Sequence, residues 1–365
     1  MTDVDAVLDF PIHRPPSEED FIRTAMRWHF GERTGSPFWL GKLPSLGFDP
    51  IADVKSFDDL RLFPNVVDEL RTVRVRDLVP RGYGPSPDIV AVFESGGTTG
   101  SPKRVVFMRD WLDRLLAWMD YDLGRRGVRR GGNWLAAVPG RPHMIGGFSD
   151  HEAELFQALK FSIDMDPRWV RKLVAGGDTA AADAYAGHLL AQVEDILRSQ
   201  DVEVLLISPP MLERIARRPE LVELVRAKIT HLLWGGTHMD PDTRRLYRSD
   251  VFPGIPLIGA YGSTMFLGAC KERIDLADDD PCVYDGLPLT VTFRVVDPRN
   301  GESVPYGTRG RLLVNHVSKA MFLPNNLERD TALRLPVTEG QYGDAVGDIL
   351  PVAVFGDAEV VVGVY

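Results

Sequence analysis

A strand–helix–strand pattern in the second half of the chain constrains the fold more than any other feature. Val202–Ser208 is an apolar run of strand length that stops at Pro209-Pro210, and a helical pattern follows over residues 211–217. Thr230–Trp234 is a second such run, which ends at Gly235-Gly236. This order predicts two parallel strands, because a helix between them returns the chain to the same edge of the sheet.

The same alternation extends over the middle of the chain. A helix is predicted from Asp110 to Arg126, a strand from Asn133 to Val138, and a helix from Asp183 to Ser199. Nearer the C-terminus, Leu289–Val296 and Gly310–Val314 alternate apolar and polar residues as antiparallel strands do. The predicted fold class is α/β, with a parallel-rich sheet flanked by helices and a smaller β-rich subdomain.

Three segments of different texture follow from these patterns. Residues 1–85 carry helical signals, such as the acidic run Glu18-Glu19-Asp20 after Ser17, and are predicted to form a helical N-terminal cap. Residues 86–285 are predicted to form the α/β core, and residues 286–365 the β-rich subdomain. Because no long Pro/Gly/Ser linker separates them, we expect the segments to fold as one body.

Charge and cysteine content exclude several classes of protein. The formal net charge of −10 over 365 residues, with both signs interspersed, argues against nucleic acid or an anionic membrane as the partner. The acidic start of the chain lacks the basic residues of a secretory signal, and no apolar run approaches the roughly 20 residues of a membrane span, so we expect a cytoplasmic protein. Cys270 and Cys282 are interpreted as reduced thiols. A small-molecule ligand fits this composition best.

The run from Ser95 to Lys103 combines three features that a phosphate chain requires. Its sequence is Ser-Gly-Gly-Thr-Thr-Gly-Ser-Pro-Lys, so glycines free the backbone N–H groups, hydroxyls add donors and the lysine adds positive charge. Asp88–Phe93 before it is interpreted as a short buried strand, which makes the run a loop at the end of a sheet. Its spacing is not that of the common Gly-x-x-x-x-Gly-Lys loop. A phosphate-binding loop is predicted, and a flexible turn is the alternative.

The order of residues in this run resembles the phosphate-binding signature of the adenylate-forming superfamily of acyl-CoA synthetases, peptide-synthetase adenylation domains and luciferases. Ala260–Thr264 is similar to the second signature of that superfamily, an aromatic-Gly-Ser/Thr-Thr loop. Ser56–Pro64 and Asp68–Arg71 resemble the phenylacetate–CoA ligase branch. The resemblance implies the fold of the superfamily's large N-terminal domain, with ATP and Mg²⁺ as cofactors.

The resemblance also implies a role for each signature residue. The catalytic residues would be Lys103, His143 and Thr264. The cofactor-binding residues would be Ser95, Gly96, Gly97, Thr98, Thr99, Gly100, Gly235, Gly236, Tyr261, Gly262, Ser263, Asp330 and Asp348. The substrate-binding residues would be His143, Trp234, Gly235 and Met265. In these roles the glycine run holds the β- and γ-phosphates, Tyr261 stacks on adenine, Thr264 meets the α-phosphate, and His143 orients the acid or bears part of its charge.

Two aspartates compete for the ribose hydroxyls. A carboxylate suits this role because it accepts hydrogen bonds from both hydroxyls at once. The pair Arg329-Asp330 follows the Asp-Pro-x-x-Gly turn at Asp297 by about the distance that the phenylacetate–CoA ligase branch shows, whereas Asp348 lies in a Gly-Asp-aliphatic context, the commoner local form. Either aspartate alone could also be a solvated turn residue.

The chain departs from the superfamily pattern in two places. Met265 stands where relatives have a glutamate that helps to hold Mg²⁺, and a thioether is a poor ligand for this hard cation, so the metal ligand is unknown and Glu94 or Glu272 could replace it. Val360–Tyr365 resembles the stretch that opens the mobile C-terminal domain, so we expect that domain and its catalytic lysine to be absent. Adenylation should then be slow unless Lys103, Arg141 or a partner compensates.

The function predicted is ATP-dependent activation of a carboxylic acid as an acyl-adenylate, with release of pyrophosphate. The resemblance to an aryl-acid branch implies a small aryl acid, and Trp234, Phe148 and Met144 fall near the presumed pocket, although these three could equally be core residues. An amine, hydroxyl or thiol, on an acceptor enzyme, a carrier protein or CoA, would take the acyl group in natural product biosynthesis, and the protein could be a homodimer. The alternatives are a catalytically silent nucleotide- or acyl-binding homologue, a core that needs a C-terminal domain in trans, and an unrelated kinase or transferase.

Overall fold

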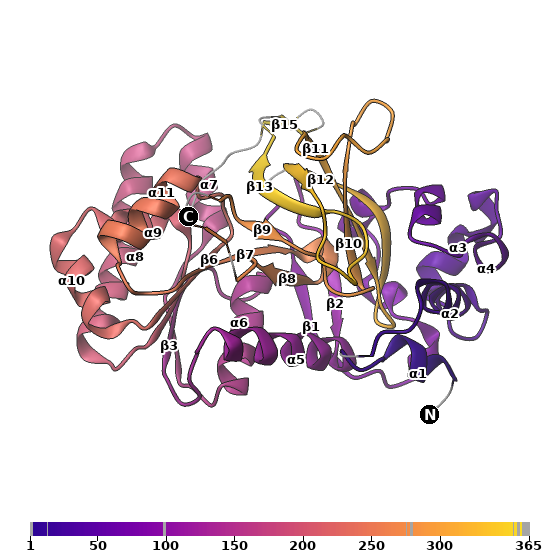
Figure 1. Ribbon diagram of the computed structural model, residues 1–365, viewed down its shortest axis with the longest axis horizontal. Helices are drawn as coiled ribbons and strands as arrows, with labels where there is room; N and C mark the ends of the chain where they lie inside the picture. The colour runs from indigo at the N-terminus through magenta and orange to yellow at the C-terminus, as the bar shows by residue number, and fades with distance from the viewer. Residues whose placement is uncertain are drawn as a thin grey trace.

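The computed structural model describes residues 3–12, 14–97, 100–274, 276–277, 280–352, 354–355 and 358–359. The first part of the chain is helical and lies at the right of Figure 1. Its elements are α1 (Asp3–Leu8), α2 (Glu18–Phe30), α3 (Pro37–Leu46), α4 (Pro50–Asp53), η1 (Asp58–Leu62), η2 (Val67–Arg71), η3 (Val75–Leu78) and η4 (Arg81–Tyr83). The Ser17 hydroxyl accepts from the Asp20 N–H at 3.1 Å and caps α2, which confirms the helix start predicted there.

A six-stranded sheet forms the centre of the molecule. Its strands are β3 (Trp134–Ala137), β4 (Lys160–Ser162), β5 (Val204–Ile207), β6 (His231–Gly235), β7 (Leu257–Ser263) and β8 (Gly268–Lys271). They pair in the order β4-β3-β5-β6-β7-β8, and β8 is antiparallel to its neighbour while the others are parallel. The parallel pair predicted from the strand–helix–strand pattern is therefore confirmed. Two helices make the connection, α9 (Pro209–Ala216) and α10 (Pro219–Lys228), and each begins with the proline at its first position.

Helices cover both faces of this sheet, as residue alternation along the strands requires. Trp134, Leu206 and Leu233 pack in one hydrophobic cluster with residues of α5 (Arg109–Arg125) and α6 (Met144–Leu155). Their strand neighbours face the other side and pack with α8 (Thr179–Ser199), α9 and α10. In Figure 1 the helices α7 (Pro167–Ala175) to α11 (Pro241–Leu246), which the turn η5 (Tyr247–Val251) follows, gather at the left, and α5 and α6 lie along the lower edge.

The glycine run connects a separate antiparallel pair, β1 (Ile89–Glu94) and β2 (Arg104–Met108). The prediction of a buried strand before the run is wrong in part, because Phe93 is buried while the other residues of β1 are half-buried or exposed. The run is a hairpin connection, not a loop from the parallel sheet. A parallel β-bridge between Glu94 and His143 places the run beside the end of the large sheet, where α6 begins.

The predicted β-rich subdomain is a five-stranded antiparallel sheet. Its strands are β9 (Val283–Tyr284), β10 (Val291–Val296), β11 (Arg309–Val317), β12 (Phe322–Leu335) and β13 (Ala345–Pro351), in the order β10-β11-β12-β13-β9. The 3-10 turn η6 (Thr264–Phe266) precedes it, and the short pair β14 (Val354–Phe355) and β15 (Ala358–Glu359) follows it. Val360–Tyr365, which resembles the start of a further domain, lies outside the described residues.

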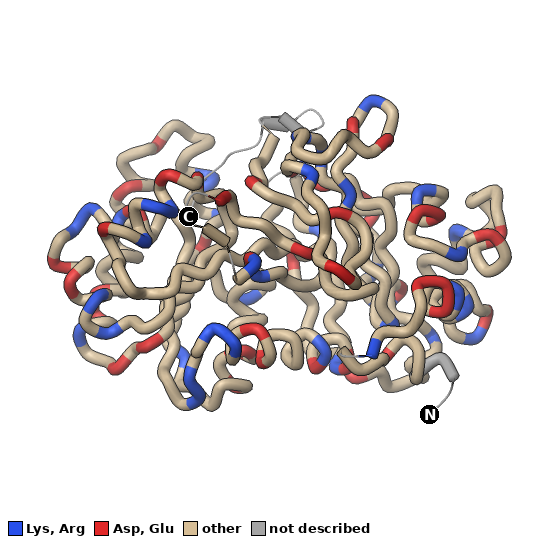
Figure 2. Tube along the Cα trace, in the orientation of Figure 1, with Lys and Arg blue, Asp and Glu red and all other residues tan. Residues whose placement is uncertain are grey.

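One hydrophobic cluster contains residues from Leu8 to Val346, so the helical segment and both large sheets share a core. The thiols of Cys270 and Cys282 are free and buried, as predicted, and burial raises the pKa of both. Within the described residues, we find no helix with the length and hydrophobicity that a membrane crossing requires. Charged residues of both signs are spread along the outer helices and loops (Figure 2).

Candidate functional site

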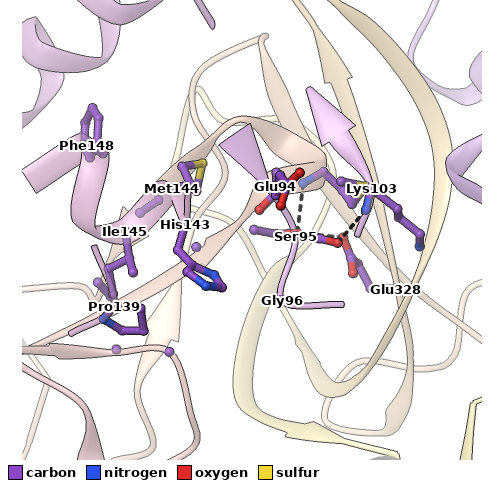
Figure 3. A pocket seen from close by; sticks show the side chains of 18 of the residues that line it. Glu94, Ser95, Gly96, Lys103, Pro139, His143, Met144, Ile145, Phe148 and Glu328 are labelled. Carbon is purple, nitrogen blue, oxygen red and sulfur yellow. Dashed lines mark hydrogen bonds between the residues drawn. The ribbon is translucent and has the colours of Figure 1, made fainter. Parts of the chain in front are cut away.

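A cavity of about 250 Å³ lies at the carboxyl ends of β3, β5, β6 and β7. The glycine run, the start of α6, β8 and the middle of β12 complete its wall. Ligands of open α/β sheets commonly bind at this edge, because loops leave the strands there and free backbone groups are available. In Figure 3, Lys103 and Glu328 lie at one end of the cavity, and Met144 and Phe148 lie toward the other.

The backbone of the glycine run is closed at its base by two hydrogen bonds. The Ser95 N–H donates to the Lys103 carbonyl oxygen at 2.9 Å, and the Lys103 N–H donates to Ser95 Oγ at 2.9 Å. Gly97 has a φ of 68°, a left-handed conformation that favours glycine. Ser95, Gly96, Gly97 and Lys103 line the cavity, whereas Thr98 and Thr99 lie outside the described residues.

Several cations surround this loop. Lys103 is 13% exposed, lies 3.6 Å from Asp68, and has a pKa that burial lowers below its ordinary value. The Arg71 guanidinium donates to the carbonyl oxygen of Ser101 and also lines the cavity. Arg171 donates to the carbonyl oxygen of Gly96. The sequence had suggested few cations besides Lys103, but the structure adds arginines from distant segments.

His143 reaches the glycine run because the Glu94 N–H donates to the Pro142 carbonyl oxygen at 3.0 Å. Burial, and after it Arg168 and Arg171, lower the pKa of His143 to about 4. The imidazole is therefore neutral at pH 7 and acts as a hydrogen-bonding group. The role of His143 toward the acid stays a prediction. Arg141, named as a possible substitute cation, pairs instead with Asp150 at 3.5 Å.

The end of β7 and the turn η6 after it direct some residues into the cavity and others away. Gly262, Ser263, Thr264 and Met265 line the wall. The Tyr261 ring packs among three aromatic rings, with centroid distances of 5.7, 6.0 and 6.1 Å, and does not belong to that wall. Its hydroxyl donates to Asp330 Oδ2 at 3.1 Å. The stacking of Tyr261 on adenine stays a prediction.

The structure separates the two candidate aspartates. Asp330 lines the cavity, and burial raises its pKa against the opposing effect of Arg329. Asp348 has a φ of 45°, pairs with Arg309, and lies 3.7 Å from His238 Nε2. Asp348 is not among the residues that line the cavity. Of the two aspartates, Asp330 thus fits a ligand-binding role.

Glu328 is a cavity residue that the sequence patterns did not reveal. It accepts from Ser263 Oγ at 3.0 Å, and burial together with Asp330 raises its pKa to about 7. Lys103 lies near enough to lower this pKa in part. The position of Glu328 could have been predicted from Asp330, because residues two apart on a strand share a face and Asp330 was already a candidate.

The donors near the glycine run fit a magnesium ion held mainly by phosphate oxygens and water. The Glu328 carboxylate is the best candidate protein ligand, since Met265 contributes only a thioether. Glu94 is neutralised by Arg104 at 2.9 Å and Arg168 at 2.6 Å. Glu272 is buried behind β7, where it accepts from the Gly259 N–H and pairs with two arginines. Over the described part of the chain, no cluster of three or more His, Cys, Asp or Glu side chains is placed to hold a metal.

Trp234 corrects one prediction about the substrate pocket. Gly235 and Gly236 line the cavity, as do Met144 and Phe148, but Trp234 is a core residue 3% exposed. Adjacent strand residues face opposite sides, so when Gly235 borders the cavity, Trp234 packs toward the helices behind the sheet.

The cavity also contains polar residues that the sequence patterns missed. They are Glu152 on α6 and Lys271 on β8, which pair with each other, and Ser208 after β5. None belongs to a local sequence motif.

The chain matches the model of a family described as AMP-binding enzyme over residues 79–321. It belongs to this family. This membership confirms the resemblance to the adenylate-forming superfamily, and the phenylacetate–CoA ligase branch stays a prediction.

Two curated relatives and two solved structures are similar to this AMP-binding family member. A D-alanine–D-alanyl carrier protein ligase from Lactiplantibacillus plantarum is 26% identical over 262 residues, 70% of this chain and 46% of that protein. A 4-chlorobenzoate–CoA ligase from Arthrobacter sp. is 24% identical over 327 residues, 88% of this chain and 54% of that protein. The chain spans about half the length of these curated relatives.

The solved structures show the shared fold. The structure of 2-hydroxyisobutyryl-CoA ligase in complex with 2-HIB-AMP and CoA is 18% identical, has a TM-score of 0.64, and aligns with 94% of this chain and 69% of its own. ATP-bound MatB from Rhodopseudomonas palustris is 19% identical, has a TM-score of 0.51, and aligns with 73% of this chain and 49% of its own. The family's large N-terminal domain fold, predicted from the signatures, is therefore confirmed.

Proposed function

We propose that this chain binds ATP and a carboxylic acid and joins them as an acyl-adenylate, with release of pyrophosphate. The observation that carries this proposal is a single cavity with two chemically different ends. One end has the glycine run, Lys103 and Arg71, which suit phosphates. The other end lies along α6 beyond a neutral histidine and suits an organic acid. Membership of the AMP-binding enzyme family supports this assignment.

In the proposed reaction, a carboxylate oxygen of the acid attacks the α-phosphorus of ATP. The bond between the α-phosphorus and the bridging oxygen breaks, and that oxygen leaves with pyrophosphate. N–H groups of the glycine run and the Lys103 ammonium would stabilise the negative charge on the phosphates. The neutral His143 would donate a hydrogen bond to the acid, and Thr264 would meet the α-phosphate.

Asp330 would hold the ribose hydroxyls, with its own orientation set by the Tyr261 hydroxyl. A magnesium ion, when bound, would neutralise phosphate charge, and Glu328 is the residue that would hold it on the protein side. Ser263 donates to Glu328 and so orients this carboxylate.

The acceptor of the acyl group is proposed to be an amine, hydroxyl or thiol. The matched relatives are named for carrier protein and CoA acceptors, which supports the thiol among these. A small aryl acid and a role in natural product biosynthesis remain part of the proposal, with Met144 and Phe148 as the apolar contacts. A core that needs a C-terminal domain in trans is the second candidate.

Pyrophosphate exchange into ATP, measured across a panel of carboxylic acids, tests the proposal. Acid-dependent exchange, with AMP and not ADP as the product, is expected. ATP binding without exchange for any acid would instead support a silent nucleotide-binding protein. Exchange that appears after a separate C-terminal domain is added would support the second candidate. ADP formation would point to an unrelated kinase and contradict the assignment.

A further inference from the structure

A buried ion pair at the far end of the cavity has no role in the proposed reaction. Lys271 Nζ and Glu152 Oε1 lie 3.6 Å apart, and their side chains are 6% and 5% exposed. Both residues line the cavity. This pair is separate from the cations around the glycine run, because it lies on α6 and β8.

The helix α6 carries the cavity wall away from the glycine run. Met144, Phe148 and Glu152 are spaced by four residues, so they share one face of the helix, and all three line the cavity. The helix starts beside Glu94, and Glu152 is about 12 Å further along its axis than Met144 at the rise of an ordinary helix. Glu152 is thus at the end remote from the phosphate-binding loop.

The strands contribute two further polar groups to the cavity wall. Ala269 and Lys271 are two apart on β8 and line the cavity together. Ser208 follows β5, which β6 and β7 separate from β8, and it lines the cavity and is 1% exposed. Its side chain makes no cap hydrogen bond to α9.

Two buried polar atoms of the cavity wall make no hydrogen bond to the described residues. They are Glu152 Oε1 and Ser208 Oγ. Buried polar atoms are ordinarily paired, and an ion pair taken out of water is a poor stabiliser unless its remaining lone pairs are satisfied. The arrangement is therefore better suited to receiving a polar group of a ligand than to supporting the core.

We propose that Glu152 and Lys271 recognise a hydroxyl group on the acid, at the end remote from its carboxylate. The pair has no net charge, so it favours a neutral group over an ammonium or a second carboxylate. A hydroxyl can donate to Glu152 Oε1 and accept from Lys271 Nζ. This inference rests on the proposed function, since it assigns the substrate class of the same cavity.

Matched acids that differ by one hydroxyl test the inference. Benzoic acid is compared with 3- and 4-hydroxybenzoic acid, and 3-phenylpropanoic acid with its 4-hydroxyphenyl analogue, in pyrophosphate exchange. We expect the best hydroxylated acid to exceed its parent in kcat/KM by about 100-fold or more, since a site built for a hydroxyl rejects an analogue without one. Acids with an ammonium or a second carboxylate at that end serve as charged comparisons, and a preference for either would overturn the hydroxyl assignment.

The variants Glu152→Gln and Lys271→Met separate recognition from folding. Each should reduce the preference for the hydroxylated acid by about tenfold or more and leave the KM for ATP unchanged. The double variant Glu152→Leu/Lys271→Met should retain exchange and lose the preference, because it replaces the pair by apolar side chains. Equal loss for hydroxylated and parent acids would show a structural role and overturn the inference.

A second measurement distinguishes failure of the inference from failure of the proposed function. Calorimetric titration of the wild-type protein with each acid pair reports binding whether or not exchange occurs. Tighter binding of the hydroxylated acid, lost in Glu152→Gln, supports the inference even without exchange. Exchange with parent acids and no hydroxyl preference overturns the inference and leaves the proposed function intact. Equal binding, or no binding, of both acids in the absence of exchange overturns both.

Discussion

Replacing each of two aspartates by asparagine separates a ligand-binding carboxylate from a structural one. Asp330 lines the cavity and accepts from the Tyr261 hydroxyl at 3.1 Å, whereas Asp348 pairs with Arg309. The Asp330→Asn variant keeps one acceptor oxygen and loses the other together with the negative charge. One hydrogen bond to a charged group contributes about 1.5–3 kcal/mol, so the Kd for ATP should rise by about 10- to 150-fold.

The matched control is Asp348→Asn. Asparagine tolerates the left-handed conformation at this position, where φ is 45°, so the backbone need not move. The Arg309–Asp348 pair is partly exposed, with side chains 30% and 24% accessible, and its loss should reduce the free energy of unfolding by no more than about 1 kcal/mol. The Kd for ATP should change by less than about twofold in this variant, since a twofold change corresponds to less free energy than one hydrogen bond contributes.

Calorimetric titration with ATP measures both Kd values, and thermal unfolding shows whether each variant is folded. A folded Asp348→Asn protein that loses as much ATP affinity as Asp330→Asn would refute the argument. That result would assign the ribose to the Gly-Asp-aliphatic motif and show that cavity geometry had misdirected the choice.

Three other predictions follow from single residues. Lys103→Met should lower acid-dependent exchange by about 10²–10³-fold, measured at saturating ATP, and an unchanged rate would exclude Lys103 from the reaction. Gly97→Ala introduces about 1–2 kcal/mol of backbone strain at a φ of 68°, so the affinity for ATP should fall by about 5- to 30-fold. The control is Gly301→Ala, at a φ of 74° in an exposed turn, which should alter thermal stability alone. Burial lowers the pKa of His29 to about 4 and that of His316 to about 3. Below pH 6.5, the ordinary pKa of histidine, both residues therefore bind protons in the unfolded chain but not in the folded protein. Stability should therefore fall as the pH decreases from 6.5 toward 4, by up to about 2 kcal/mol per histidine at pH 5, relative to a His29→Gln/His316→Gln variant, because the raised pKa of Glu328 acts in the opposite direction in both proteins. Equal pH profiles of the two proteins in chemical denaturation would contradict the burial argument.

Local patterns in the sequence predicted much of the framework. The parallel pair β5 and β6 followed from two apolar runs around a helical segment, and the antiparallel strand β10 from alternation. Both depend on the period of neighbouring residues, which the backbone geometry sets. The glycine run was also visible, because its requirement for glycine, hydroxyl donors and a cation is met within nine consecutive residues.

Which residues share the cavity was decided by tertiary structure. Trp234 looked like a pocket residue from its position next to Gly235, but alternation turns it into the core. Glu152 and Lys271 are far apart in the sequence and meet only because α6 packs against the sheet edge that ends in β8. The choice between two aspartates likewise depends on which strand faces the glycine run.

Short segments of the sequence thus determine the order of strands and helices and the phosphate-binding loop, since periodicity and residue chemistry act over a few neighbouring positions. Short segments do not determine the chemistry at the remote end of the cavity. Glu152 and Lys271 come from two separate elements, and they meet only once the sheet is assembled and α6 covers one of its faces. The proposed recognition of the substrate depends on packing, because the fold excludes water from this pair and leaves Glu152 Oε1 without a hydrogen bond to the described residues.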